Sequence, residues 1–162
     1  MKTKKLTMLA LTTAVAMILS FVESQIPAFV AVPGVKMGLA NIAVVFALYI
    51  MGWKEAWLIS LVRVLIISIL FGSAASLMYS TAGAALSLLG MGLLKRTDKF
   101  STVAVSVCGG VLHNVGQIIM ASIILETAAL RYYLPVLMLS GIVAGVVIGI
   151  VSGILVNRIQ LK

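Results

Sequence analysis

The chain consists of long apolar runs separated by short breaks that carry glycine, proline or charged residues. A helix crosses a hydrocarbon core about 30 Å thick with roughly 20 apolar residues. Six runs approach that length, although the second, with about 15 residues, is short for a span and must tilt little or extend. The runs are Leu6–Val22, Met37–Met51, Ala56–Phe71, Ser73–Leu94, Val103–Leu125 and Leu134–Val156. This pattern predicts an all-α bundle of six transmembrane helices in one integral membrane domain, residues 1–162.

The composition supports this fold class and narrows the possible partners. Hydrophobic residues make up 62% of the chain and charged residues 10%, whereas a soluble domain is about half apolar and a quarter charged. The net charge of +8 comes from residues at the ends of apolar runs, without the basic stripe of a nucleic-acid surface. We therefore expect a lipid bilayer as a partner and no nucleic acid. Cys108, the single cysteine, is interpreted as a small core residue.

The N-terminal segment has two interpretations. Its basic start and apolar run resemble a secretory signal peptide. The run Leu6–Val22 is, however, near spanning length and longer than a usual signal core. A retained first helix is favoured, and a cleaved signal peptide is the alternative.

The basic residues predict the orientation of the helices. If the N-terminus is inside, nine of the twelve lie on the cytoplasmic side, Lys36 and Arg131 lie outside, and Arg63 lies within a span. We expect a multi-pass protein of the cell (cytoplasmic) membrane with both termini inside. The cytoplasmic set is Lys2, Lys4, Lys5, Lys54, Lys95, Arg96, Lys99, Arg158 and Lys162.

The last run carries a glycine at every fourth position. Such a stripe lets another helix approach backbone to backbone. Ordinary packing within the bundle is favoured over a dimer interface. The stripe is Gly141, Gly145, Gly149 and Gly153.

Polar residues lie deep in two of the apolar runs. His113, Asn114 and Gln117 share one face of the fifth run, and His113 lies roughly 15 Å from its cytoplasmic start, near mid-bilayer. Arg63 lies in the middle of the third run, where a guanidinium costs about 3 kcal/mol or more and keeps its proton. Arg63 must therefore face an aqueous cavity or a partner, for which Glu23 is the best candidate.

These residues and others in the outer halves of the runs predict a binding cavity open to the outside. Single residues such as Asn41 or Ser80 are more simply explained as links between helices. A cavity is favoured for the group around Arg63, because ionisable residues within a membrane are functional by default. The basic and acidic residues of the outer region sum to +1, which favours an anionic ligand. The candidate lining is Glu23, Lys36, Asn41, Arg63, Tyr79, His113, Asn114 and Gln117.

Several kinds of chemistry are missing from the sequence. Asp98 is the single aspartate, whereas a prenyl diphosphate synthase needs several carboxylates to hold magnesium. No phosphate-binding glycine loop and no nucleophile motif is present. We therefore expect no catalytic residues, no metal site and no cofactor, and favour a binding or transport subunit over an enzyme.

The stretches "SFVESQIP", "PGVKMGLANI" and "SVCGGVLHNVGQ" resemble the Gx transporter family, which is also labelled heptaprenyl diphosphate synthase component I. That family is similar to the substrate-binding S components of energy-coupling factor transporters. The resemblance implies an S-component-like fold with a small-molecule substrate. It also implies three partner chains, namely a transmembrane coupling subunit and two ATPase subunits.

S components dock on the coupling subunit through an A-x-x-x-A pattern on their first helix. Ala10 and Ala14 match this pattern in "LALTTAVA", although small pairs of this spacing are common in membrane helices. Two functions remain open. The first is an S component that captures a metabolite, and the second is an accessory membrane subunit of isoprenoid or quinone metabolism.

Overall fold

The computed structural model describes residues 2–25 and 38–160, and every regular element in this part of the chain is helical. The all-α prediction is therefore confirmed. The elements are α1 (Lys2–Gln25), α2 (Asn41–Ile50), α3 (Trp53–Phe71), α4 (Ala74–Arg96), α5 (Thr102–Ile124), the 3-10 helix η1 (Ala128–Tyr133) and α6 (Leu134–Gln160).

Four of the described helical segments are long and apolar enough to cross a membrane: α1, α4, α5, and η1 continued by α6. The chain is thus of the multi-pass membrane type. The helix α3 has 19 residues but carries Lys54, Glu55 and Arg63. The helix α2 has 10 residues, or roughly 15 Å, which is half of a hydrocarbon core. The six spans and their orientation stay a prediction.

Serine side chains cap the N-terminal ends of two of the long helices. The hydroxyl of Ser73 accepts a hydrogen bond from the backbone N–H of Ser76 at the start of α4. Ser101 accepts one in the same way from Ala104 at the start of α5. These caps satisfy backbone donors that would otherwise have no partner in the first turn. They explain why the helices begin where the apolar runs begin.

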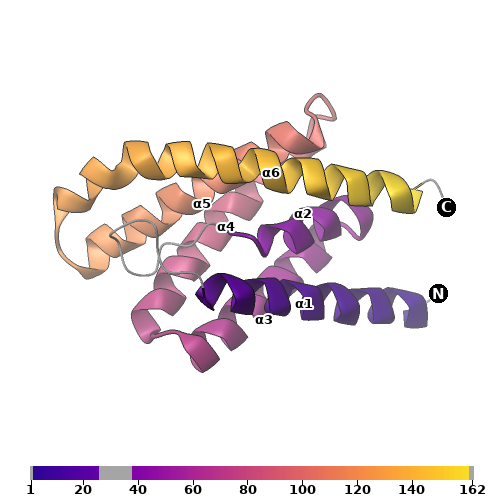
Figure 1. Ribbon diagram of the computed structural model, residues 1–162, viewed down its shortest axis with the longest axis horizontal. Helices are drawn as coiled ribbons and strands as arrows, with labels where there is room; N and C mark the ends of the chain where they lie inside the picture. Colours follow the sequence, from indigo (N-terminus) through magenta and orange to yellow (C-terminus); the bar gives the residue numbers. More distant parts are fainter. Residues whose placement is uncertain (1, 26–37, 161–162) are drawn as a thin grey trace.

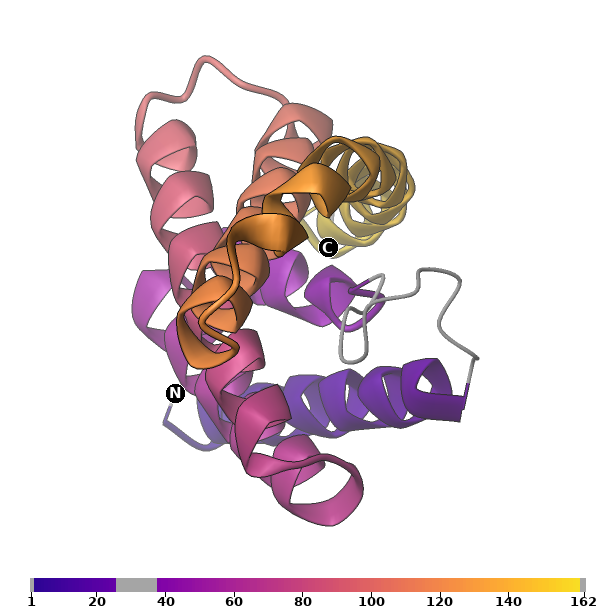
Figure 2. The ribbon, with the colours of Figure 1, turned by 90° about the vertical axis from the view of Figure 1, so that its left-hand side faces the viewer.

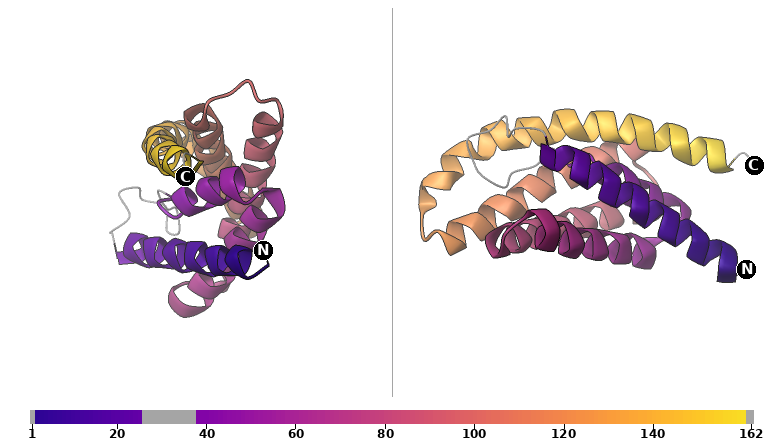
Figure 3. Two further views of the ribbon diagram at one scale, coloured as in Figure 1. Left: turned by 90° about the vertical axis from the view of Figure 1, so that its right-hand side faces the viewer. Right: turned by 60° about the horizontal axis from the view of Figure 1, so that its bottom comes forward.

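The short helix α2 forms the centre of the molecule. It packs against α1, α3 and α6, and it lies between α1 and α6 (Figure 3). Leu48 is 1% exposed, and four further apolar residues of α2 are buried as well. A helix that is apolar on all sides belongs in a core. Glycines with positive φ stand before and after it, Gly38 at +84° and Gly52 at +115°, and reverse the chain there.

A lysine from α4 closes the C-terminal end of α2. The ammonium of Lys95 donates a hydrogen bond to the carbonyl of Leu48 and lies 5.0 Å from the centre of the Tyr49 ring. A cation is favourable at this end because unpaired carbonyls give it partial negative charge. The contact fixes α2 to the C-terminal end of α4.

The helix α5 lies between α4 and α6 (Figure 2), and glycines bring these helices together. A Cβ on Gly145 of α6 would lie 2.6 Å from Cα of Val107, and one on Gly149 would lie 2.6 Å from Cα of Val103. The glycine stripe therefore serves packing inside the bundle, as the sequence favoured.

The beginning of α1 and the end of α6 lie at the same end of the molecule (Figure 1). An ion pair between Lys5 and Glu55 joins the first turns of α1 and α3. Lys5 is largely exposed, so this pair adds at most about 1 kcal/mol to stability. The ion pair shows that the N-terminal turns of α1 and α3 lie next to each other.

The glycine stripe yields a test of the packing. Gly145→Ala should lower the free energy of unfolding by about 1–3 kcal/mol, because its methyl group meets backbone of α5. Gly153→Ala is the matched control, since its Cβ would make an ordinary contact of 3.9 Å with Cβ of Thr102. Thermal unfolding of both variants in detergent measures the difference. Equal stability of the two variants would contradict the assigned interface.

Candidate functional site

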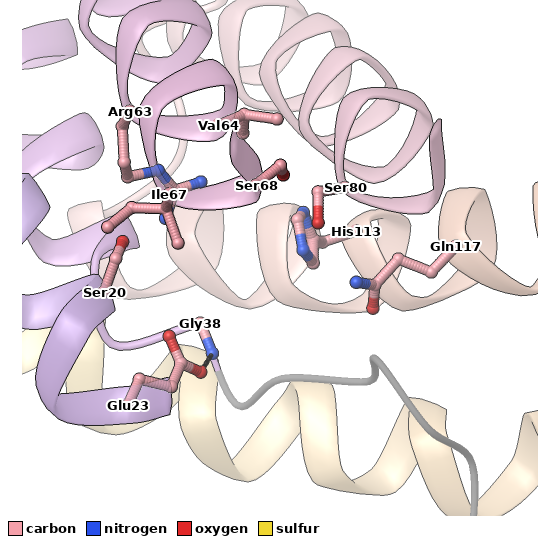
Figure 4. A pocket seen from close by; sticks show the side chains of 10 residues that line it. All are labelled: Ser20, Glu23, Gly38, Arg63, Val64, Ile67, Ser68, Ser80, His113 and Gln117. Carbon is pink, nitrogen blue, oxygen red and sulfur yellow. Dashed lines mark hydrogen bonds between the residues drawn. The ribbon is translucent and has the colours of Figure 1, made fainter. Parts of the chain in front are cut away.

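A cavity of about 30 Å³ opens between α1, α3, α4 and α5 (Figure 4). Its lining is mostly polar although the surrounding bundle is apolar. The lining residues are Ser20, Glu23, Gly38, Arg63, Val64, Ile67, Ser68, Ser80, His113 and Gln117.

Arg63 reaches the cavity from the buried face of α3. Along this helix Ser60, Val64 and Ile67 are buried and Leu61 and Leu65 are exposed, a helical period that turns Arg63 away from lipid. Arg63 is 6% exposed. Among the residues that the structure describes, its Nε finds no hydrogen-bond acceptor.

Glu23 brings a negative charge to the same cavity from the last turn of α1. It is buried, and its carboxylate acts electrostatically on the guanidinium of Arg63. One carboxylate oxygen accepts a hydrogen bond from the backbone N–H of Gly38. The carboxylate therefore joins the end of α1 to the turn that leads into α2. An anion is favourable there, because the N-terminal end of a helix has partial positive charge.

His113 and Gln117 enter the cavity from α5, one helical turn apart. Gly83 of α4 makes room for them. A Cβ on Gly83 would lie 2.7 Å from the carbonyl oxygen of His113 and 2.9 Å from Cγ of Gln117. Gln117 is 2% exposed, and neither Oε1 nor Nε2 has a hydrogen-bond partner within the described part of the chain.

Asn114 has a different position from the one that the sequence suggested. It is buried, but its Nδ2 donates a hydrogen bond of 2.6 Å to the carbonyl of Leu137 in α6, and it is not among the lining residues. The three polar residues of the fifth run lie within 100° of arc, so a helix can turn two of them to α4 and the third to α6. Asn114 ties helices together instead of lining the cavity.

The remaining residues that the sequence predicted for the cavity do not line it in the described structure. Asn41 is buried, with its Nδ2 3.1 Å from where a Cβ of Gly38 would lie, but it does not line the cavity. Tyr79 is half-buried and outside the lining, and its neighbour Ser80 lies within it. Lys36 lies outside the described residues.

The sequence did not single out Ser20 and Ser68, which both line the cavity. Serine is common in membrane helices, where its hydroxyl can bond to its own helix. Spacing offers a weak signal, since Ser20 lies one turn before Glu23 in α1. Without the fold, neither serine differs from the others in these helices.

Ala10 and Ala14 lie on the exposed face of α1. Leu11 and Ile18 on the same helix are also more than half exposed. The two alanines therefore do not serve packing within the described part of this chain. They leave a shallow strip on an otherwise bulky apolar surface.

The arrangement can hold a small polar group through hydrogen bonds and charge. It holds one cation, one carboxylate, an imidazole, an amide and three hydroxyls. Within residues 2–25 and 38–160, no group of three His, Cys, Asp or Glu side chains could hold a metal ion.

A family model described as heptaprenyl diphosphate synthase component I matches residues 12–155 of the chain. No curated protein matches the chain. No solved structure matches it either.

Replacing each of the two amide side chains of α5 by an apolar one should affect stability differently. Asn114→Leu should cost about 0.5–1.5 kcal/mol of stability, because a buried hydrogen bond to α6 is lost. Gln117→Met should leave stability unchanged or raise it, since its amide has no partner to lose among the described residues. Thermal unfolding in detergent compares the two. A larger loss in Gln117→Met than in Asn114→Leu would refute these assignments.

Proposed function

The chain belongs to the heptaprenyl diphosphate synthase component I family, and on that premise we propose that it is an S-component-like binding subunit. It captures a small anionic metabolite from outside the cell for uptake by an energy-coupling factor transporter. The observation that carries this proposal is the buried Arg63 in one cavity with His113 and Gln117. A charged side chain within a membrane is costly and usually serves a function, and binding an anion would be such a function.

The arrangement of the charges supports recognition of an anion. Arginine pairs with a carboxylate or phosphate through parallel hydrogen bonds. Arg63 Nε is available for such a bond within the described structure. Glu23 acts on Arg63 electrostatically and so lowers the cost of burial without a ligand.

The proposal includes six spans with both termini inside. In this orientation the shared end of α1 and α6 (Figure 1) faces the cytoplasm. Glu23 stands two residues before the opposite end of α1, at Gln25, so the cavity lies toward the outside. Capture from outside follows from that position.

The proposal also includes three partner chains: a transmembrane coupling subunit and two ATPase subunits. A chain of this kind has no visible nucleotide site and needs an external source of energy. The exposed strip of Ala10 and Ala14 fits close approach by a helix of the coupling subunit, because small residues let backbones meet.

The family name favours a second candidate function. A component I of a prenyl diphosphate synthase would be an accessory membrane subunit that presents a diphosphate-bearing lipid to a separate catalytic chain. Arg63 would suit a diphosphate as well as a carboxylate. The two functions differ in the ligand that the protein carries.

Native mass spectrometry of the protein purified from its own host separates them. We expect a bound polar metabolite, and Arg63→Lys should reduce its affinity about 5- to 150-fold, which corresponds to about 1–3 kcal/mol. Arg131→Lys is the matched control, because Arg131 is exposed on η1. A bound prenyl diphosphate would favour the second function. Undiminished occupancy in Arg63→Lys would remove Arg63 as the anchor.

The proposed contact of Ala10 and Ala14 with the coupling subunit can be tested separately. Ala10→Leu combined with Ala14→Leu should abolish co-purification with the coupling subunit, because the added side chains hold the two helices apart. Expression should persist, since both alanines are exposed in this chain. Val22→Phe enlarges the exposed outer part of α1 and should leave co-purification unchanged. Full co-purification of the double variant would exclude this surface.

A further inference from the structure

Gln117 is the cavity residue whose side chain has both a hydrogen-bond donor and an acceptor without a partner in the described part of the chain. It is 2% exposed and lines the cavity from α5. Its amide end points toward the side of the cavity that holds His113 (Figure 4). Within the described part of the chain, both Oε1 and Nε2 lack a hydrogen-bond partner. Buried polar atoms are nearly always paired in native structures, so this amide indicates a group that enters the cavity.

The chemistry of an amide determines what that group must offer. Nε2 donates and Oε1 accepts, and the two atoms lie side by side. A simple carboxylate only accepts, so it would satisfy Nε2 and leave Oε1 without a donor. A partner that satisfies both atoms carries an acceptor next to an N–H donor. Primary amides, lactams and ureas have this arrangement.

Arg63 sets a second requirement at another part of the cavity. In Figure 4 the side chains of Arg63 and Gln117 enter from opposite sides, with Ser80 and His113 between them. Arg63 Nε is a buried donor with no acceptor among the described residues. One ligand that meets both needs has its negative charge at one end and its donor–acceptor group at the other. The volume of about 30 Å³ further restricts it to a compact molecule or head group.

We propose that the cavity binds a compact anion with an amide-type group at the end opposite its charge. The anion pairs with Arg63, and the amide-type group forms two hydrogen bonds with Gln117. This inference rests on the proposed function and names the substrate class of the same cavity. Gln117 is then the residue that determines specificity, and Arg63 supplies affinity for anions in general.

Isothermal titration calorimetry on the purified full-length protein in detergent tests this assignment. The probes are malonamate, succinamate and glutaramate, which place an amide at increasing distance from a carboxylate. Each is compared with the monomethyl ester of the parent diacid, which keeps the charge and carbonyl but lacks the N–H donors. At least one amide should bind roughly tenfold or more tightly than its ester, since a site built for a donor rejects analogues without one.

Variants identify the residue responsible. Gln117→Met should reduce the amide-to-ester ratio to about one, because the amide loses two hydrogen bonds and the ester loses one, while Arg63→Lys should weaken both compounds by a similar factor. Ser87→Ala is the control, because its hydroxyl is also buried without a partner among the described residues but lies outside the cavity lining. It should leave the ratio unchanged.

Three results would overturn the inference. The first is binding of none of the three amides at millimolar concentration. The second is equal affinity for amides and esters in the wild type, as expected if water alone pairs with Gln117. The third is an unchanged ratio in Gln117→Met. If esters and amides bind equally and Arg63→Lys weakens both, anion capture stands and only the amide specificity fails.

Discussion

Burial of the guanidinium of Arg63 is the constraint on which the arrangement of the helices around the cavity depends. A permanent charge within an apolar bundle requires polar surroundings. The structure supplies Glu23 from α1 and polar side chains from α3, α4 and α5. Four helices therefore converge on one point for an electrostatic reason, and the cavity is the space that they leave around it.

Close approach of the backbones makes this convergence possible. Gly83 brings α4 against the carbonyl of His113, and Gly145 brings α6 against Val107. In lipid, apolar side chains gain little by leaving the tails for one another, so small residues and interhelical hydrogen bonds hold the helices. The bond from Asn114 to Leu137 belongs to the second kind.

The sequence was sufficient for the helical class and for much of the cavity. Apolar length determines where helices form, and the cost of a buried charge singles out Arg63 without any structure. It could not assign Asn114, because the rotation of α5 about its axis decides whether this side chain faces the cavity or α6, and only the packing of the helices fixes that rotation. It also did not show that α2 is a half-length helix enclosed by the others, since an apolar run has the same composition in lipid and in a protein core.

The enclosed α2 has a mechanical consequence. Its N-terminal end adjoins Gly38, which Glu23 holds, and its C-terminal carbonyl at Leu48 is held by Lys95. A helix transmits displacement along its axis with little compression, because each turn is braced by its own hydrogen bonds. The helix α2 thus holds two points roughly 15 Å apart at a fixed separation, namely Gly38 in the cavity lining and the ammonium group of Lys95.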